Sequence, residues 1–210
     1  MMKILTVSDQ VEPFLYDRYD PSRFQGVDLI LSCGDLPPEY LSFLVTQFNV
    51  PLYYVKGNHD IRANGYNPGG CVDLDGKLIW HQGLRILGFE GCHWYNGKPH
   101  QYTEHQMRKK IGRLRFKIWR AGGLDIVITH APPRHVHDAE DRCHMGFKSF
   151  RRLIDRYAPR YFIHGHMHFN YTANPQRITV ANKTQVVNTY GYFLIEIKEG
   201  QDPEQVPGQA

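Results

Sequence analysis

The sequence predicts an α/β fold, in which buried strands alternate with amphipathic helices. Three short runs are nearly continuous in Ile, Leu and Val, and they cover residues 3–8, 27–33 and 126–129. Such runs are typical of strands that other elements cover on both faces. Helical patterns lie between the strands, at residues 38–48, 105–120 and 146–157. This alternation indicates an α/β chain.

Further β-rich runs indicate that the chain contains more than one kind of strand pairing. Three of them end abruptly in polar residues, at 52–56, 85–88 and 161–164. Another group follows one after the other with turns between them, at 77–80, 85–88, 185–188 and 192–197. Because short turns join antiparallel neighbours, we expect some antiparallel pairing or a second sheet.

Length and composition are those of one ordinary domain. The chain has 210 residues, of which 41% are hydrophobic and 22% are charged, and this excludes a disordered, fibrous or solenoid protein. The net charge of +4 gives no general reason to expect a nucleic-acid or membrane partner. We expect one domain over residues 1–198 and a flexible tail over 199–210, a stretch with two prolines, two glycines and little apolar content.

Cysteine spacing indicates a reduced protein, and hydropathy predicts no membrane segment. The four cysteines form no C-x-x-C pair, which argues against a zinc ribbon and against a disulfide framework. No apolar run approaches the length of a membrane helix, and the first eight residues have no cleavage-site pattern. We therefore expect a cytoplasmic protein without a membrane partner.

Polar residues at the ends of five predicted strands carry the chemistry. They are Ser8-Asp9, Gly34-Asp35, Gly57-Asn58-His59-Asp60, His130-Ala131-Pro132-Pro133 and Gly165-His166-Met167-His168. In open α/β sheets, ligands bind beyond the carboxyl ends of the strands. Carboxylate, amide and imidazole donors together suit Mn, Fe, Zn or Ni better than calcium. The twelve histidines of the chain fit a transition-metal site.

The ordered set GD, GNHD, H-A-P-P and G-H-x-H resembles the motifs of the calcineurin-like metallophosphoesterase superfamily. The resemblance spans residues 9–168. It implies a fold of two mixed β-sheets sandwiched by helices, in four layers. It also implies hydrolysis of phosphoester bonds by a metal-bound hydroxide at two divalent metal ions.

The resemblance assigns a role to each motif residue. Asp35 corresponds to the carboxylate that bridges both ions. His59 would stabilise the phosphoryl charge or protonate the leaving group, and Asp60 would orient it. The other ligands form two sets, Asn58, His130 and His166 for one ion, and Asp9 and His168 for the other.

One position departs from the family pattern. The family usually opens with D-x-H, whereas Asp9-Gln10-Val11 has valine in place of the ligating histidine. Three outcomes follow: water completes the first site, Glu12 or Gln10 substitutes, or only the second site is filled. Pro13 favours an extended Glu12, so substitution by Glu12 requires a turn before it. We therefore expect one or two divalent ions per chain.

Loops that flank the predicted site contain candidate substrate contacts. His93 and Trp94 lie in one aromatic loop and His135 in another, and each has packing as its alternative role. Asp9 and Asp35 have helix capping as theirs. His164 shares the spacing of the G-H-x-H histidines, but we expect a structural role for it.

The 107–120 segment predicts an amphipathic helix with a basic outer face. Its apolar stripe consists of Met107, Ile111, Leu114 and Ile118. Its basic residues are Arg108, Lys109, Lys110, Arg113, Arg115, Lys117 and Arg120. A solvated helix face is the simplest interpretation, and a nucleic-acid groove is the alternative.

Three functions remain open. A phosphodiesterase or phosphatase acting on a small phosphorylated substrate fits best, because His59 has no purpose in a scaffold. The alternatives are a non-catalytic binding scaffold with the phosphoesterase fold, which the loss of the D-x-H histidine favours, and a nuclease that uses the basic helix.

Overall fold

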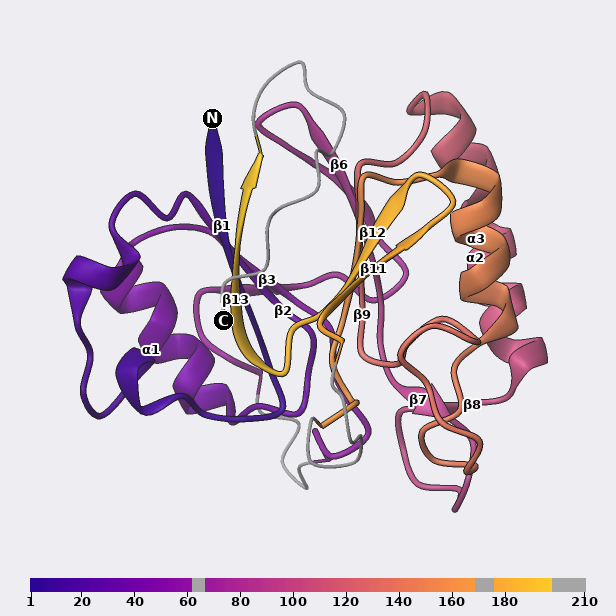
Figure 1. The fold of residues 1–210 in the computed structure, drawn as a ribbon, viewed down its shortest axis with the longest axis horizontal. Helices are drawn as coiled ribbons and strands as arrows, with labels where there is room; N and C mark the ends of the chain where they lie inside the picture. The colour runs from indigo at the N-terminus through magenta and orange to yellow at the C-terminus, as the bar shows by residue number, and fades with distance from the viewer. Residues whose placement is uncertain (62–66, 169–175, 198–210) are drawn as a thin grey trace.

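Two β-sheets face each other, and helices cover their outer sides. The computed structural model describes residues 1–61, 67–168 and 176–197, so the predicted tail at 199–210 lies outside the described part. In Figure 1, α1 lies outside one sheet, while α2 and α3 lie outside the other. This is the four-layer arrangement of helix, sheet, sheet and helix that the family resemblance implies.

The first sheet has five strands in the order β13-β1-β2-β3-β4. Its parallel part comprises β1 (Met2–Ser8), β2 (Leu29–Ser32), β3 (Leu52–Tyr54) and β4 (Cys71–Asp73). β13 (Gly191–Ile197) pairs antiparallel with β1 and brings the last described residues back to the first strand.

The second sheet has six strands in the order β11-β12-β10-β9-β6-β5. Its parallel centre comprises β6 (Leu84–Phe89), β9 (Ile126–Thr129), β10 (Tyr161–His164) and β12 (Thr184–Asn188). Antiparallel edge strands flank it, namely β5 (Leu78–His81) and β11 (Ile178–Ala181). A separate two-stranded pair joins β7 (Cys92–His93) to β8 (Gln101–Tyr102).

Local sequence signals set the helix boundaries. α1 (Pro38–Phe48) begins with a proline in its first turn and ends at left-handed Asn49. α2 (Glu104–Arg120) begins with a capping box between Thr103 and Gln106. α3 is Lys148–Tyr157, and two short 3₁₀ helices, Pro13–Leu15 and Pro21–Phe24, precede β2.

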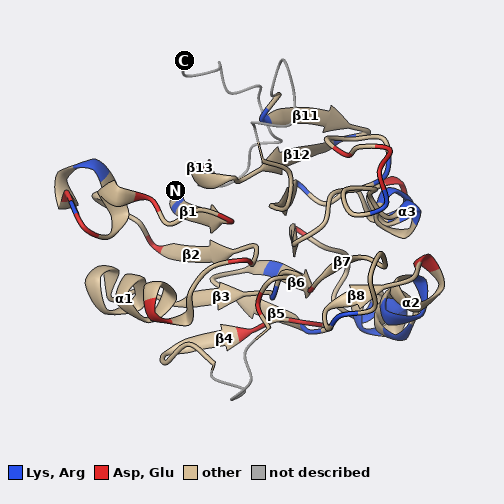
Figure 2. Ribbon diagram, turned by 90° about the horizontal axis from the view of Figure 1, so that it is seen from below, with Lys and Arg blue, Asp and Glu red and all other residues tan. Residues whose placement is uncertain are grey.

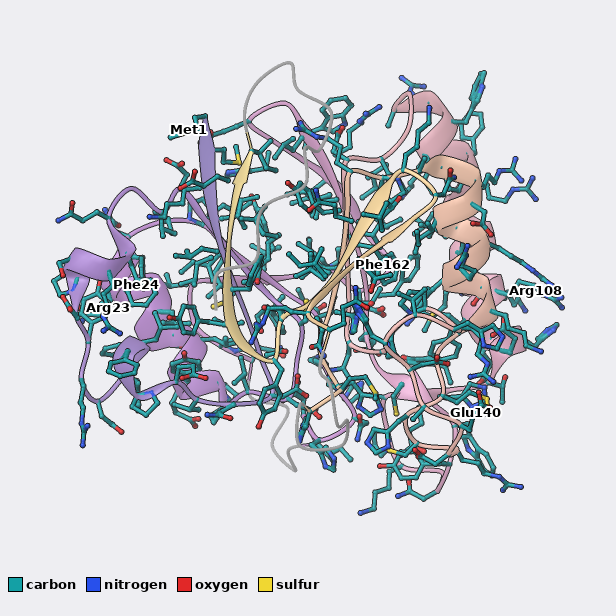
Figure 3. All side chains as sticks on the ribbon, viewed as in Figure 1. Met1, Arg23, Phe24, Arg108, Glu140 and Phe162 are labelled. Carbon is teal, nitrogen blue, oxygen red and sulfur yellow. The ribbon has the colours of Figure 1, made fainter. Side chains whose placement is uncertain are left out.

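Alternating side chains place each central strand between two cores. In β9, Ile126 and Ile128 face the core between the sheets, whereas Val127 faces α2 and α3. In β2, Leu29 and Leu31 face the same central core, and Ile30 faces α1. Because both faces of these strands are buried, the strands read as continuous apolar runs. Phe162 of β10 packs into the core under α2 and α3 (Figure 3).

The predicted elements are largely confirmed. The ranges of α1, β9 and β10 agree with the sequence prediction, and the expected antiparallel pairing is present, in β5–β6, β11–β12 and β1–β13. β2 is shorter than the predicted 27–33, since Val27 and Asp28 precede its first ladder position. The sequence prediction missed four short strands, β4, β7, β8 and β11, because runs of two to four residues carry little periodicity.

The predicted basic face of α2 is present. Figure 2 shows Lys and Arg gathered on this helix, and Arg108 projects outward (Figure 3). The four stripe residues are buried against the second sheet. The outer face also carries exposed Phe116 and Trp119, whose ring centroids lie 5.7 Å apart. No helix in the described ranges has the length and apolarity to cross a membrane.

Parallel pairing brings the predicted site residues to one edge. Ser32 of β2 lies between Val7 of β1 and Tyr54 of β3. In the second sheet, His164 of β10 lies beside Thr129 of β9. All five motif loops follow directly from these strand ends, so the two sheets deliver their polar side chains to a common rim.

A chain of neutral imidazoles lies behind this rim. His164 Nδ1–H donates to the Gly165 carbonyl at 2.9 Å, and His164 Nε2 accepts from His137 Nδ1–H at 2.9 Å. The hydroxyl of Thr179 donates to His137 Nε2 at 2.8 Å. Burial lowers the pKa of His137 to about 4 and that of His164 well below its usual value. His164 thus has the structural role expected for it.

We expect acid to destabilise the protein through these two rings. In the unfolded chain each histidine titrates near pH 6.5, so below that pH the unfolded state binds protons that the folded state excludes. The free energy of unfolding is therefore highest above about pH 6.5 and falls toward pH 4, by up to about 1.4 kcal/mol per pH unit for each ring. Urea unfolding of wild type and His137→Gln across this range measures the effect. The variant should show the shallower pH dependence, and equal slopes would contradict the assignment.

Candidate metal centre

Asp35 occupies a left-handed turn after β2. Its φ of 57° turns the chain sharply, and its side chain is only 8% exposed. The backbone N–H of His59 donates to Asp35 Oδ1 at 2.8 Å. A Cβ at Gly57 would overlap Asp35 Oδ1 and lie 2.6 Å from His130 Cε1. Only glycine at position 57 lets the backbone approach this closely.

His130, directly after β9, faces Asp35 from the other sheet. Its buried ring donates Nδ1–H to the Cys33 carbonyl at 2.7 Å, which fixes its orientation. Nε2 then lies 3.0 Å from Asn58 Oδ1 and 3.2 Å from Asp35 Oδ2. Two predicted ligands, Asp35 and Asn58, therefore lie within hydrogen-bond distance of the Nε2 of a third, His130.

Charge pairing outweighs burial at this contact. Burial alone would lower the pKa of His130, but the Asp35 carboxylate raises it to about 10. Burial alone would raise the pKa of Asp35, but the charge and hydrogen bond of His130 hold it well below its usual range. The proton on His130 Nε2 thus faces the oxygen atoms of Asp35 and Asn58. A divalent cation that binds there must displace this proton.

His166 completes this group of ligands. It too is left-handed (φ 66°), and its N–H donates to both carboxylate oxygens of Asp9, at 2.9 and 3.1 Å. Its Nε2–H donates to the Cys143 carbonyl at 2.8 Å, which leaves the lone pair on Nδ1. One donor atom from each of Asp35, His130 and His166 lies within 4.8 Å of the others.

Asp9 and His168 form the other predicted set. The Asp9 side chain is fully buried, and its Oδ1 lies 3.5 Å from His168 Nε2. The ring of His168 packs on Tyr190 at 4.8 Å. A Cβ at Gly165 would lie 2.5 Å from Asp9 Oδ2, so this loop also requires glycine. The structure supplies two donors here, one carboxylate and one imidazole.

Neither Val11 nor Glu12 adds a donor to the groups of three found among the described residues. Val11 packs against the core under α1. Glu12 is extended (φ −83°, ψ 123°), as Pro13 predicts, and a Cβ at Gly191 would lie 2.3 Å from its Oε1. Burial raises the pKa of Glu12, and the charge of Arg177 opposes that shift.

The predicted catalytic pair lies on the rim beside Asp35. His59 is exposed, and its backbone is tied to the Asp35 carboxylate. Asp60 Oδ2 accepts from the N–H groups of Asp35 and Gly57, each at 2.8 Å. Burial and the Asp35 charge raise the pKa of Asp60. Asp60 therefore joins the two loops through their backbones, and its orienting role for His59 remains a prediction.

The predicted substrate contacts lie outside both donor groups. The His93 ring packs on Phe147 at 5.3 Å, which is the packing role foreseen as its alternative. Trp94 is 46% exposed, and His135 is exposed with a left-handed backbone. Their contact with substrate remains a prediction.

Three residues next to the predicted ligands have no role assigned from the sequence. The Tyr95 hydroxyl accepts from Asn58 Nδ2 at 3.3 Å. Cys143 and His144 form a second possible group of ligands with His166. Tyr95 belongs to the same aromatic loop as His93 and Trp94, whereas no strand end or motif marks Cys143 or His144.

The residues present fit a divalent transition metal. Asp35, Asn58, His130 and His166 offer oxygen and nitrogen donors, and hydrogen bonds to neighbouring carbonyls hold both imidazoles in place. Glycine at positions 57 and 165 leaves the carboxylate oxygens of Asp35 and Asp9 uncovered by a neighbouring Cβ.

The chain belongs to the calcineurin-like phosphoesterase family, whose sequence profile matches residues 7–170. Among solved structures, the protein TT1561 of Thermus thermophilus is similar, with a TM-score of 0.64 at 16% identity over 90% of this chain and 89% of that chain. GAP50, the anchor in the inner membrane complex of Plasmodium, gives a TM-score of 0.53 at 13% identity over 89% of this chain and 70% of that chain. At these identities the likeness shows the fold alone. No curated protein sequence matches the chain.

We expect Asp35→Asn to weaken metal binding by at least about tenfold, because it removes the charge shared by the predicted ions. Metal content after dialysis against Mn²⁺ or Zn²⁺, measured by plasma mass spectrometry, checks this. Asp155→Asn is the matched control, since Asp155 is half-exposed and pairs with Arg151 on α3. Equal metal content in Asp35→Asn and wild type would show that Asp35 is not a ligand.

Proposed function

We propose that the protein is a metal-dependent phosphoesterase that hydrolyses a small phosphomonoester or phosphodiester. The observation that carries the proposal is the meeting of Asp35, His130 and His166 within 4.8 Å at the same strand ends that present exposed His59. A phosphate bound at this rim would meet both a cation site and a proton donor.

Metal chemistry explains why these donors are useful. When bound, one or two divalent ions such as Mn, Fe, Zn or Ni offset phosphate charge and lower the pKa of a water molecule. Asp35, Asn58, His130 and His166 would hold one ion, and Asp9 and His168, with Asp35 and solvent, would hold the other. Three protein ligands with an open position for solvent are a common catalytic arrangement.

His59 is suited to act on the leaving group. Its ring is exposed, whereas its backbone is fixed to the Asp35 carboxylate at 2.8 Å. This contact holds the residue beside the proposed cation site and leaves the imidazole accessible to substrate. A histidine in this place can stabilise the phosphoryl charge or donate a proton to the departing oxygen.

One observation favours a non-catalytic scaffold. Val11 contributes an apolar contact where the family has a ligand, so the first site has only Asp9 and His168 besides the shared Asp35. A scaffold would need neither exposed His59 nor the buried Asp35–His130 pair. We therefore favour the enzyme, and hydrolysis assays distinguish the two.

The position of α2 argues against a nuclease. α2 ends at Arg120 and β9 begins at Ile126, and Arg85 contacts both the Ala121 carbonyl and Asp125. This end of the helix therefore lies beside the amino end of β9, opposite the rim. Part of the basic face points away from the proposed catalytic edge.

The described cysteines are unpaired, which supports a cytoplasmic location.

We expect His59→Ala to lower kcat by about 10²–10⁴-fold, the usual contribution of a general acid. Hydrolysis of a chromogenic phosphomonoester and phosphodiester with added Mn²⁺ or Zn²⁺ measures the rate. Metal content should not change, because the His59 contact to Asp35 uses the backbone. His105→Ala, an exposed histidine in the first turn of α2, is the control. A rate in His59→Ala equal to that of wild type would remove His59 from the mechanism.

A further inference from the structure

A second group of possible ligands lies beside the proposed centre. Cys143 and His144 belong to the loop between β9 and α3, and His166 follows β10. One ligand atom from each of these three residues lies within 4.8 Å of the others. The proposed hydrolysis makes no use of Cys143 or His144, although both border a predicted metal ligand.

The sulfur-to-nitrogen separation is close to that of a tetrahedral site. Cys143 Sγ lies 4.0 Å from His166 Nε2, and the ring centroids of His144 and His166 are 5.0 Å apart. This Nε2 carries the proton donated to the Cys143 carbonyl, so a metal ion binds there only after that proton moves to Nδ1. Zinc bonds of about 2.3 Å to sulfur and about 2.0–2.1 Å to nitrogen place tetrahedral S and N ligands about 3.6 Å apart. A shift of a few tenths of an ångström brings sulfur and nitrogen to that separation.

Asp141 organises the two loop ligands. His144 Nδ1–H donates to the carboxylate of Asp141, at 3.0 Å from each oxygen, which puts the lone pair of the ring on Nε2. The N–H groups of Cys143 and His144 donate to Asp141 Oδ1 at 3.0 and 3.1 Å. A carboxylate that accepts from the far nitrogen of an imidazole is the usual partner of a metal-bound histidine.

Ion pairs and backbone contacts hold the rest of the loop. Arg134 pairs with Asp138 at 2.6 Å and with Glu140 at 2.7 Å. Asp138 Oδ2 also accepts from the Gly146 N–H at 3.0 Å. The loop is therefore fixed on both sides of Cys143 and His144, as a preformed ligand site requires.

We propose that Cys143, His144 and His166 form a second divalent-metal position beside the Asp35–His130–His166 group, suited to Zn²⁺ rather than Mn²⁺. A thiolate ligand selects borderline-soft ions, whereas Mn²⁺ prefers oxygen donors. Three protein ligands leave the fourth tetrahedral position to solvent. Binding releases the Cys143 thiol proton to solvent. The inference extends the proposed function, because both positions use His166. Its neutral ring offers one lone pair, so His166 serves the ion at one position at a time.

Cobalt substitution tests the thiolate ligand without relying on activity. Co²⁺ is added to the full-length protein kept reduced with a phosphine, and absorbance is recorded. We expect sulfur-to-cobalt charge transfer in the near ultraviolet for wild type, together with visible d–d bands. Cys143→Ser should lose the ultraviolet band, whereas Cys71→Ser should keep it, because partly exposed Cys71 lies on β4 outside the group. Visible bands without the ultraviolet band, or an unchanged band in Cys143→Ser, would overturn the proposal.

A labelling experiment on the wild-type chain avoids any folding defect of the variant. Alkylation of Cys143 by iodoacetamide, followed by peptide mass spectrometry, should slow by at least about tenfold with Zn²⁺, because a metal-bound thiolate is shielded. Mn²⁺ should give no protection, and Cys71 should react equally in all samples. Equal rates for Cys143 with and without Zn²⁺ would contradict the proposal.

The two proposals fail in different ways. If the thiolate band is absent while Mn²⁺-dependent hydrolysis persists, only the Cys143 site is wrong. If the band is present without hydrolysis of any phosphoester, the site stands and the enzymatic function is wrong. Asp35→Asn should keep the band, because Cys143 and His144 do not depend on that carboxylate.

Discussion

The contact between Asp35 and His130 joins the two sheets at the rim. Asp35 follows β2 of the first sheet, His130 follows β9 of the second, and both side chains are almost fully removed from water. Burying such a pair is costly unless hydrogen bonds satisfy the remaining polar atoms. The Cys33 carbonyl, Asn58 and the His59 N–H provide these bonds. The positions of the neighbouring loops therefore follow from this one contact.

Backbone geometry at the strand ends supports the same contact. Asp9, Asp35 and His166 all have left-handed backbones, which side-chain-bearing residues adopt infrequently and which often mark functional sites. Gly57 and Gly165 let neighbouring loops approach the Asp35 and Asp9 carboxylates. The rim thus consists of sharp turns held together by polar contacts, and a bound cation would replace a proton within an existing network.

The sequence predicted the long buried elements and the polar residues that meet at the rim. Continuous apolar runs identified β1, β2 and β9, and the motif order identified Asp35, Asn58, His130 and His166. Short strands such as β4 and β7 were missed because few residues carry their pattern. Cys143 and His144 were missed for another reason, since their place beside His166 depends on how the loop before α3 folds back. Spacing along the chain contains no signal for that contact.

Several further properties depend on whether a cation occupies the space among Asp35, His130 and His166, including the role of His59 and the sharing of His166 with Cys143. Anomalous diffraction from crystals grown with Mn²⁺ measures that occupancy directly. We expect an anomalous peak within bonding distance of an Asp35 carboxylate oxygen and His130 Nε2. Crystals grown with Mn²⁺ that show no peak at that position, and an unchanged Asp35–His130 contact, would contradict a cation site there.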